Sequence, residues 1–513
     1  MTWPDLVLIV YFTLWLVLAV HGGHRVWLLW LYRRPRPKAS QNGDTSLGPV
    51  VTIQLPIFNE YHVVERLLAH TVNVRYPAGR LEIQVLDDST DETALLTRRL
   101  VEEYQSQGVD IHWMHRSDRV GFKAGALEAG LKIARGEYVA VFDADFLPQK
   151  DFLEKTVPWL VEGYGMVQTR WSHINLKDSW LTRVQGTLLD GHFVVEHAAR
   201  CYGDRWFNFN GTAGIWKKTV IEDAGGWQHD TLTEDLDLSY RAQMKGHRFL
   251  YLENVLAPAE LPGTIAAFKA QQHRWAKGSV QTGKKLIARI WSAKVPLRHK
   301  IEATFHLTAN VGHPSVLALA LLIPWAVVSR GDVQWEVSGF LDLILFTCAT
   351  TSLFLFYGVA ILRSGQGNVL RRWLSMPVVM AAAIGISISQ TRAVMEGLWG
   401  ETGSFVRTPK WGGKTVTRYK SAVHWVVWIE CLVALYLWIG LAVVLWDGWW
   451  KSAPFVMLFA MGYTMIGVGS LIESYRSVGM KWRSPSTASS VATGTQVIHQ
   501  SQTGSIQVSV GSE

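Results

Sequence analysis

The fold of this chain is decided by the stretch that runs from Tyr138 to Asp145, YVAVFDAD. Five largely apolar residues lead directly into two carboxylates, a pattern that predicts a buried strand over 138–142 followed by an acidic loop. Further strands are expected at residues 50–57, 81–87 and 111–115, and helices at residues 61–74, 92–107 and 122–134. Strands that alternate with helices predict an α/β domain whose parallel sheet is covered by helices.

Polar residues follow three of these strands. They are Asn59 and Glu60, Asp87 and Asp88, and Asp143 and Asp145. Ligands of open α/β sheets bind beyond the carboxyl ends of the strands. A ligand site is therefore expected where these three loops meet.

The acidic loop itself indicates a metal site. Mg²⁺ and Mn²⁺ are typically held by one or two carboxylates together with substrate phosphates, and Asp143 and Asp145 have a suitable spacing. Such an ion would neutralise a departing diphosphate. Taken alone, the motif is weak evidence, because Asp-x-Asp in a loop is usually a solvated turn.

Two other acidic motifs each allow two interpretations. Asp87 and Asp88 suit a nucleotide contact, but Asp88 also precedes a predicted helix and could cap it. Thr233, Glu234 and Asp235 could supply a general base that deprotonates a sugar hydroxyl, or they could cap the helix that follows.

A predicted amphipathic helix over residues 265–290 carries Gln271, Arg274 and Trp275. Their i, i+3 and i+4 spacing places them on one face. An amide, a guanidinium and an indole suit a sugar ring and a phosphate. An interfacial helix with Trp and Arg at the lipid headgroups is the alternative.

In this order and at these separations, the four motifs resemble those of the processive family 2 glycosyltransferases: cellulose synthase and, more closely, the cellulose synthase-like mannan and glucan synthases. The resemblance covers about residues 50–285 and implies an α/β domain of the GT-A type, with a Rossmann-like mixed sheet and later membrane spans. It also implies a nucleotide-sugar donor, UDP-glucose or GDP-mannose, and Mg²⁺ or Mn²⁺ as cofactor.

The resemblance assigns roles by position. Asp235 resembles the catalytic base, and Asp143 and Asp145 resemble the metal ligands. Acceptor contacts are implied for Gly211, Thr233, Glu234 and Trp275; Gly211 could also simply form a tight turn. Nucleotide-sugar contacts are implied for Asn59, Glu60, Asp87, Asp88, Lys123, Asp143, Gln271, Arg274 and Trp275.

Five apolar runs are long enough to cross a bilayer core of roughly 30 Å. They cover residues 6–31, 305–328, 341–362, 423–446 and 455–471. Arg33, Arg34 and Arg36 follow the first run, so the positive-inside rule predicts that the next domain is cytosolic.

The net charge of +8 is explained by the same rule, and nucleic-acid binding is not expected. Three widely spaced cysteines give neither a disulfide framework nor a zinc motif.

A sixth apolar segment, at residues 373–390, is interrupted by Pro377, Gly385 and Gln390. We expect an interfacial or re-entrant helix there rather than a full span. Beyond it, Phe405 to Lys410 resembles the gating loop of the family, although Arg407 and Pro409 depart from the cellulose synthase pattern.

The expected organisation of the chain has five parts. They are an N-terminal transmembrane helix (1–32), a linker (33–49), a cytosolic GT-A domain with an interfacial helix (50–300), transmembrane helices with the re-entrant segment and gating-like loop near 373–420 (301–476), and a disordered tail (477–513). We expect a multi-pass protein of the plasma membrane. The sequence leaves its oligomeric state open.

These features favour an inverting hexosyltransferase that builds a β-linked glucan, mannan or glucomannan and extrudes it between Trp-rich spans. Aromatic belts at the membrane surfaces would explain the Trp content equally well. One rival is an enzyme that transfers a single hexose to a membrane lipid, such as ceramide or diacylglycerol. The other is a transporter or receptor with a degenerate nucleotide-binding domain, although few intramembrane charges support it.

Overall fold

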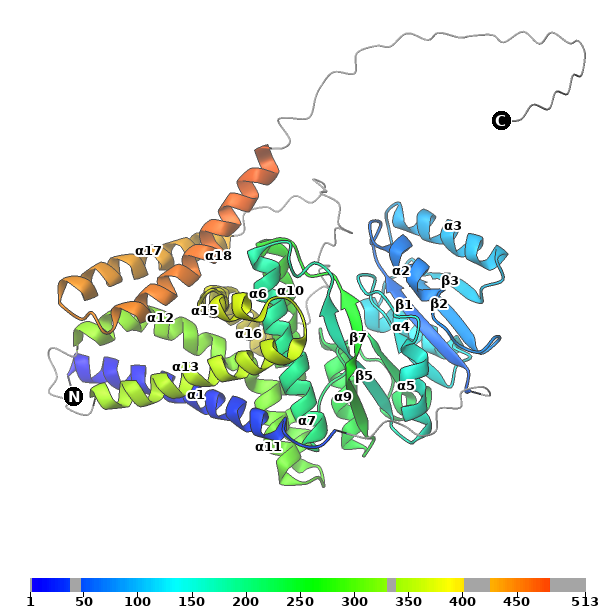
Figure 1. Ribbon diagram of the computed structural model, residues 1–513, viewed down its shortest axis with the longest axis horizontal. Helices are drawn as coiled ribbons and strands as arrows, with labels where there is room; N and C mark the ends of the chain where they lie inside the picture. The colour runs from blue at the N-terminus through cyan, green and yellow to red at the C-terminus, as the bar shows by residue number, and fades with distance from the viewer. Residues whose placement is uncertain (1, 37–47, 330–337, 401–424, 480–513) are drawn as a thin grey trace, which may run out of the picture.

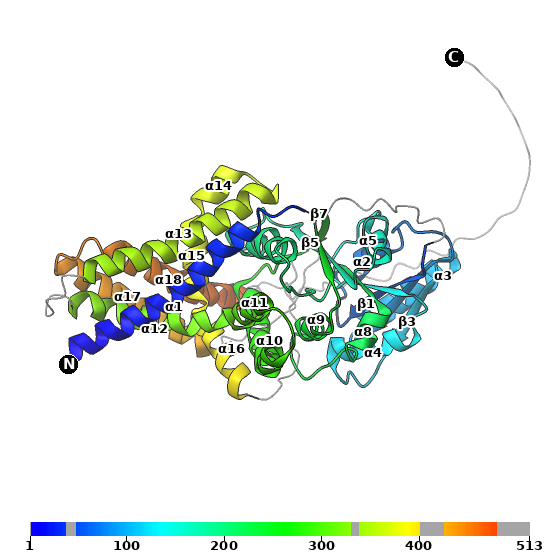
Figure 2. The same ribbon diagram turned by 90° about the horizontal axis from the view of Figure 1, so that it is seen from below.

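The computed structural model describes residues 2–36, 48–329, 338–400 and 425–479. It has two lobes that lie side by side: an α/β domain and a bundle of long apolar helices (Figures 1 and 2). Most of the predicted linker, the gating-like loop at 405–410 and nearly all of the predicted tail lie outside the described residues.

A seven-stranded mixed sheet forms the centre of the α/β domain, with strand order β3-β2-β1-β4-β6-β5-β7. Its strands are β1 (Val51–Ile57), β2 (Leu81–Asp87), β3 (Ile111–His115), β4 (Tyr138–Val141), β5 (Met166–His173), β6 (Gly214–Lys217) and β7 (Phe249–Ala259). The first four strands are parallel, as predicted, but β6 is antiparallel to both β4 and β5. The expectation of a wholly parallel sheet was therefore wrong, whereas the mixed sheet that the family resemblance implied is confirmed.

Burial on both faces explains why β1 is so apolar. Val51, Ile53, Leu55 and Ile57 enter one hydrophobic core, since alternate residues of a strand point to the same face. On the other face, the buried Gln54 side chain donates to Gln84 of β2 at 3.0 Å. This bond satisfies one polar atom of each buried side chain, and buried polar atoms in a sheet interior are usually hydrogen-bonded.

Helices cover both faces of the sheet (Figure 2). One core contains side chains of α2 (Val64–Thr71), α3 (Thr93–Ser106) and α5 (Phe152–Val161). The opposite core contains side chains of α4 (Phe122–Ile133), α8 (Lys218–Asp223) and α9 (Glu234–Met244). The remaining helices of this lobe are α6 (Trp180–Asp190), the π-helix η1 (Gly191–His197) and α7 (Ala198–Tyr202).

Two details of local structure differ from the predictions. The helix expected at 61–74 is shorter, because the chain forms turns before Val64 and after Thr71. Asp88 does not cap α3; instead the Asp91 carboxylate accepts a hydrogen bond from the Thr93 N–H group.

The second lobe consists of helices. They are α1 (Trp3–Leu31), α10 (Ile265–Ser292), α11 (Leu297–Thr308), η2 (Ala309–Val311), α12 (Gly312–Val328), α13 (Ser338–Ser364), α14 (Val369–Leu374), α15 (Met376–Gly385), α16 (Ser387–Trp399), α17 (Trp425–Trp446) and α18 (Ala453–Gly479). Among the described residues, five helices are long and apolar enough to cross a membrane, so the chain is a membrane protein.

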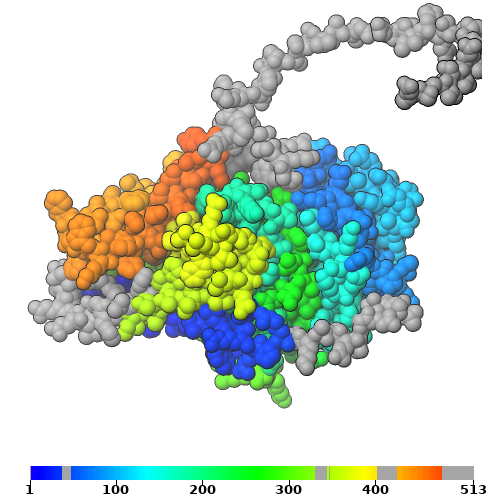
Figure 3. Space-filling model, in the orientation of Figure 1, coloured from blue at the N-terminus to red at the C-terminus, as the bar shows by residue number. Residues whose placement is uncertain are grey.

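The segment predicted to be interfacial or re-entrant forms α15 and α16, which meet at a bend of 45°. This pair would count as a sixth span if it crossed the membrane as one broken helix, so the choice between the two arrangements remains a prediction. Figure 3 shows α14 and α15 at the boundary between the two lobes.

The amphipathic helix α10 joins the lobes. At its N-terminus the Ile265 N–H group donates to Glu473 of α18 at 2.9 Å. One turn later Lys269 forms a 2.7 Å ion pair with the buried Glu430 of α17. Burial of a carboxylate in an apolar helix is costly unless it is paired, so this contact favours one orientation of α10 against the bundle.

A Gly462→Val substitution tests the close packing of α15 against α18. A Cβ atom at Gly462 would overlap the carbonyl oxygen of Ala381, and small residues are what allow membrane helices to approach this closely. We expect a loss of about 1–3 kcal/mol of stability, seen as a lower unfolding temperature in detergent. The neighbouring, partly exposed Met461 provides the control as Met461→Val. Equal unfolding temperatures for both variants would contradict this packing.

Candidate active site

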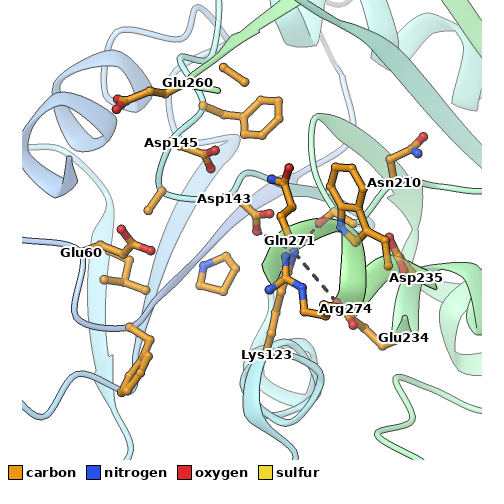
Figure 4. Close-up of a pocket in the computed structure, with 18 of the residues that line it drawn as sticks. Glu60, Lys123, Asp143, Asp145, Asn210, Glu234, Asp235, Glu260, Gln271 and Arg274 are labelled. Carbon is orange, nitrogen blue, oxygen red and sulfur yellow. Dashed lines mark hydrogen bonds and ion pairs between the residues drawn. The ribbon is translucent and has the colours of Figure 1, made fainter. Parts of the chain in front are cut away.

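A cleft opens beyond the carboxyl ends of β1 and β4 and is closed on its far side by α9 and α10. Its walls include predicted residues from all four motifs: Glu60, Asp88, Lys123, Asp143, Asp145, Gly211, Thr233, Glu234, Asp235, Gln271, Arg274 and Trp275. Figure 4 labels eight of these residues, Glu60, Lys123, Asp143, Asp145, Glu234, Asp235, Gln271 and Arg274, and shows them converging from separate elements. The structure thus brings together motifs that are far apart in sequence.

Lys123, from the first turn of α4, lies at the centre of this arrangement. Its ammonium group is 2.6 Å from Asp143 and 3.9 Å from Glu234, and it donates a 2.9 Å hydrogen bond to the Gly211 carbonyl. Burial alone would lower the pKa of Lys123, but the carboxylates of Asp143 and Glu234 raise it above its ordinary value. Lys123 therefore stays charged and holds together the acidic loop that contains Asp143, the 209–212 loop and α9.

Asp235 occupies the first turn of α9, and its side chain faces the 209–212 loop. Gly211 has φ +77°, and a Cβ atom there would come within 3.0 Å of an Asp235 carboxylate oxygen and 3.2 Å of the Lys123 nitrogen. Glycine is thus required both by backbone conformation and by space. Burial and the neighbouring charge of Glu234 raise the pKa of Asp235 to about 7.

Capping does not explain the motif that contains Asp235. Thr233 is the N-cap residue of α9, but its side chain makes no capping hydrogen bond; its hydroxyl lies 3.1 Å from that of Thr282 on α10. Three carboxylates occupy the first turn of α9, where the helix dipole stabilises negative charge.

The shared face of α10 points into the cleft as predicted. Gln271, Arg274 and Trp275 all line it, and the Trp275 ring is 6.3 Å from that of Trp171 on β5. Burial lowers the pKa of Arg274, although Asp143 and Glu234 oppose the effect. An amide, a cation and an indole are therefore presented to whatever occupies the cleft.

Two predicted nucleotide contacts, Asn59 and Asp87, lie just behind the cleft wall. The Asp87 carboxylate accepts hydrogen bonds from the Ser89 N–H group at 2.9 Å and from the Trp113 indole at 3.0 Å. Asn59 accepts one from the Thr90 N–H group at 2.8 Å. Asn59 thus links the loops that follow β1 and β2, whereas Asp87 fixes the start of the second loop against β3. Contact of either side chain with a nucleotide remains a prediction.

Sequence reasoning missed several residues of the cleft wall. Arg119 lies 3.3 Å above the Phe58 ring, beside Asp88. Glu260 follows directly after β7, so the strand-end rule would have found it had this strand been predicted. His173 ends β5 and faces the buried Asp190 at 3.4 Å.

A chain of polar and charged side chains extends from the 209–212 loop to the helices of the second lobe. The Asn210 amide nitrogen lies 3.0 Å from His192 in the π-helix η1, and His192 contacts Glu196 at 3.0 Å. Burial would raise the pKa of Glu196, but Arg200 and His192 hold it well below its usual range. Arg200 in turn forms an ion pair with Glu302 of α11 at 3.0 Å. π-Helical turns often occur at functional sites, and this one supports the wall of the cleft.

The donor set of the acidic loop suits a hard divalent cation. Asp143 and Asp145 both line the cleft, and in the described part of the chain no group of three or more His, Cys, Asp or Glu residues could hold a metal ion unaided. Two carboxylates that need further oxygen ligands match the way Mg²⁺ binds beside substrate phosphates.

Comparison with known proteins agrees with this geometry. The family model described as "Glycosyltransferase like family 2" matches residues 49–278. Glucomannan 4-beta-mannosyltransferase 1 of Oryza sativa subsp. japonica is 34% identical over 460 residues, which cover 85% of each chain. The chain belongs to glycosyltransferase family 2. Glucomannan 4-beta-mannosyltransferase 2 of Arabidopsis thaliana is 43% identical over 260 residues, 48% of each chain.

Among solved structures, this glycosyltransferase resembles the mannosyltransferase PcManGT from Pyrobaculum calidifontis, determined with GDP-Man and Mn²⁺. That structure has a TM-score of 0.51 and 23% identity, covering 76% of this chain and 99% of the other. The similarity confirms the expected GT-A-like mixed sheet. Together these relatives confirm the predicted family and the hexosyltransferase class, so the transporter or receptor alternative is wrong.

The raised pKa of Asp235 predicts how transfer depends on pH. Because a protonated carboxyl cannot accept a proton, kcat/KM should fall about tenfold per pH unit below about pH 7 and level off above it. Initial rates over roughly pH 5.5 to 8.5 would measure this profile. Donor binding, measured over the same range, serves as the control and should stay constant. A flat rate profile would show that no group with this pKa limits transfer.

Proposed function

We propose that this family 2 glycosyltransferase transfers mannose from GDP-mannose to the end of a growing β-linked mannan or glucomannan. The observation that carries the proposal is the convergence of the carboxylates of Asp143 and Asp145, a carboxylate with a raised pKa and the α10 face in one cleft. The choice of GDP-mannose over UDP-glucose is supported by the relatives, which are named glucomannan 4-beta-mannosyltransferases.

The donor would extend from the β1 and β2 strand ends to the acidic loop. In this proposal Glu60 and Asp88 face the nucleoside, with Asn59 and Asp87 fixing the loops that present them. Lys123, Gln271 and Arg274 supply an amide and two cations for the diphosphate and the sugar. Asp143 and Asp145 would hold Mg²⁺ or Mn²⁺, which would offset the charge of the diphosphate leaving group.

Asp235 acts as the general base of the reaction. It removes the proton from an acceptor hydroxyl, and the resulting oxygen attacks the anomeric carbon of the donor sugar. The bond between that carbon and the diphosphate oxygen breaks as the new glycosidic bond forms. A single displacement inverts the anomeric centre, so an α-linked donor gives a β-linked product.

The acceptor would enter from the side of α9 and the 209–212 loop. Thr233, Glu234 and Gly211 border Asp235 there, and Trp275 offers an aromatic face for a sugar ring. Sugar rings present apolar C–H faces that stack well on indole. Trp275 can therefore position an acceptor sugar without contacting its hydroxyl groups.

The membrane lobe favours polymer synthesis over the glycosylation of a lipid. Five candidate spans and the bent α15–α16 pair are more than one lipid-facing site needs. We infer that the catalytic domain lies in the cytosol of a plasma-membrane enzyme, because arginines follow α1 immediately. The product would then leave between the spans.

Parallel assays with labelled GDP-mannose and UDP-glucose test the proposal. Purified protein in nanodiscs, supplied with Mn²⁺ or Mg²⁺, should place label from GDP-mannose in a polymer that a β-mannanase cleaves. EDTA should abolish incorporation, and renewed metal should restore it, because the carboxylates of Asp143 and Asp145 cannot offset the negative charge of the diphosphate without the ion. Label in the lipid fraction alone would favour the glycolipid alternative, and label from UDP-glucose alone would overturn the donor assignment.

A further inference from the structure

A second cavity, of about 500 Å³, lies in the α/β domain apart from the catalytic cleft. Its walls come from the residues after α1, the loop between α7 and β6, the C-terminal end of α9 and the start of β7. None of the residues that line it lines the catalytic cleft. It is therefore a separate candidate binding site.

Two arginines give the cavity its charge. Arg205 donates only to backbone carbonyls, those of Gly203 at 2.7 Å and Asp204 at 2.9 Å. Arg248 lies 4.9 Å from the Tyr164 ring. Within the described ranges, no carboxylate lies within ion-pair distance of either guanidinium.

The acidic groups near the cavity are already neutralised by other cations. Asp204 pairs with Arg298 at 2.5 Å, and Glu253 pairs with Arg36 at 2.7 Å. Burial, followed by the nearby positive charge of Arg298, lowers the pKa of Arg205. The described part of the cavity wall thus has an excess of positive charge.

The walls between these cations are aromatic. They contain Tyr164, Tyr202, Trp206, Phe207 and Phe249. A mixture of guanidinium groups and aromatic rings suits a ligand that carries a phosphate next to apolar groups. An anion without apolar groups would gain little binding energy from the aromatic walls.

The position of the cavity identifies the ligand class. Pro35 and Arg36 follow the candidate span α1, and His299 lies at the start of the candidate span Leu297–Val328. Figures 1 and 2 show the end of α1 and the start of α11 at the same level, where the two lobes meet. The cavity therefore lies near the ends of two candidate spans, and basic pockets close to a membrane surface bind anionic lipids.

We propose that this cavity binds the phosphate of an anionic lipid headgroup through Arg205 and Arg248. The bound lipid would fix the α/β domain against the membrane surface at a point distant from the chemistry. A soluble phosphate would use the same two guanidinium groups, so the experiment must distinguish the two sources.

Lipid titrations of the detergent-purified full chain test this site. Fluorescent phosphatidylglycerol is titrated into the native protein, the Arg205→Gln/Arg248→Gln variant and a charge-matched control, Arg80→Gln/Arg99→Gln, whose arginines are exposed and outside the cavity. The cavity variant should bind about tenfold more weakly, because charge-assisted hydrogen bonds to the phosphate are lost. Arg248→Gln alone, at an exposed residue whose side chain makes no hydrogen bond in the described structure, covers the case in which the double variant does not fold.

Competition separates the two phosphate sources. If phosphatidylcholine and inorganic phosphate fail to displace phosphatidylglycerol, the ligand is the anionic lipid. If inorganic phosphate displaces it in the native protein, the two arginines form a site for soluble phosphate. Equal affinity of the native protein, the cavity variants and the control for phosphatidylglycerol would overturn the proposal.

Discussion

The catalytic cleft depends on one buried ammonium group. Lys123 lies between Asp143 of the acidic loop and Glu234 of α9, and it also donates a hydrogen bond to the backbone carbonyl of Gly211. Without this cation, carboxylates from two separate segments would face one another in a partly desolvated space, which is unfavourable for like charges. Burial and the charge of Glu234 outweigh the effect of Lys123 at Asp235 and raise the pKa of that carboxyl to about 7.

Helix α10 connects this chemistry to the membrane. One face presents Gln271, Arg274 and Trp275 to the cleft, while Lys269 pairs with Glu430 of α17. Near the middle of the helix, Lys277 contacts Glu396 of α16 at 3.5 Å. A shift of the bundle would therefore move the cleft face of α10, so a growing product between the spans and a donor in the cleft would act on the same helix.

The sequence predicted those parts of the site that follow local rules. Strand ends located Glu60, Asp88, Asp143 and Asp145, and helical spacing placed the three α10 residues on one face. The antiparallel β6 was not predictable, because strand direction depends on pairing with β4 and β5 rather than on composition. Nor could it be predicted that Asp87 would be held by Ser89 and Trp113, or that Lys123 would meet Glu234, since these contacts depend on the tertiary fold.

The most direct test of the account is an Asp235→Asn variant, in which the carboxylate is replaced by an amide of the same shape. Donor affinity and the rate of sugar transfer would be measured on the same preparation. The account predicts that donor binding is nearly unchanged and transfer is abolished, because only the proton acceptor is lost. Transfer at the native rate would show that another group removes the proton and would contradict the mechanism assigned to this cleft.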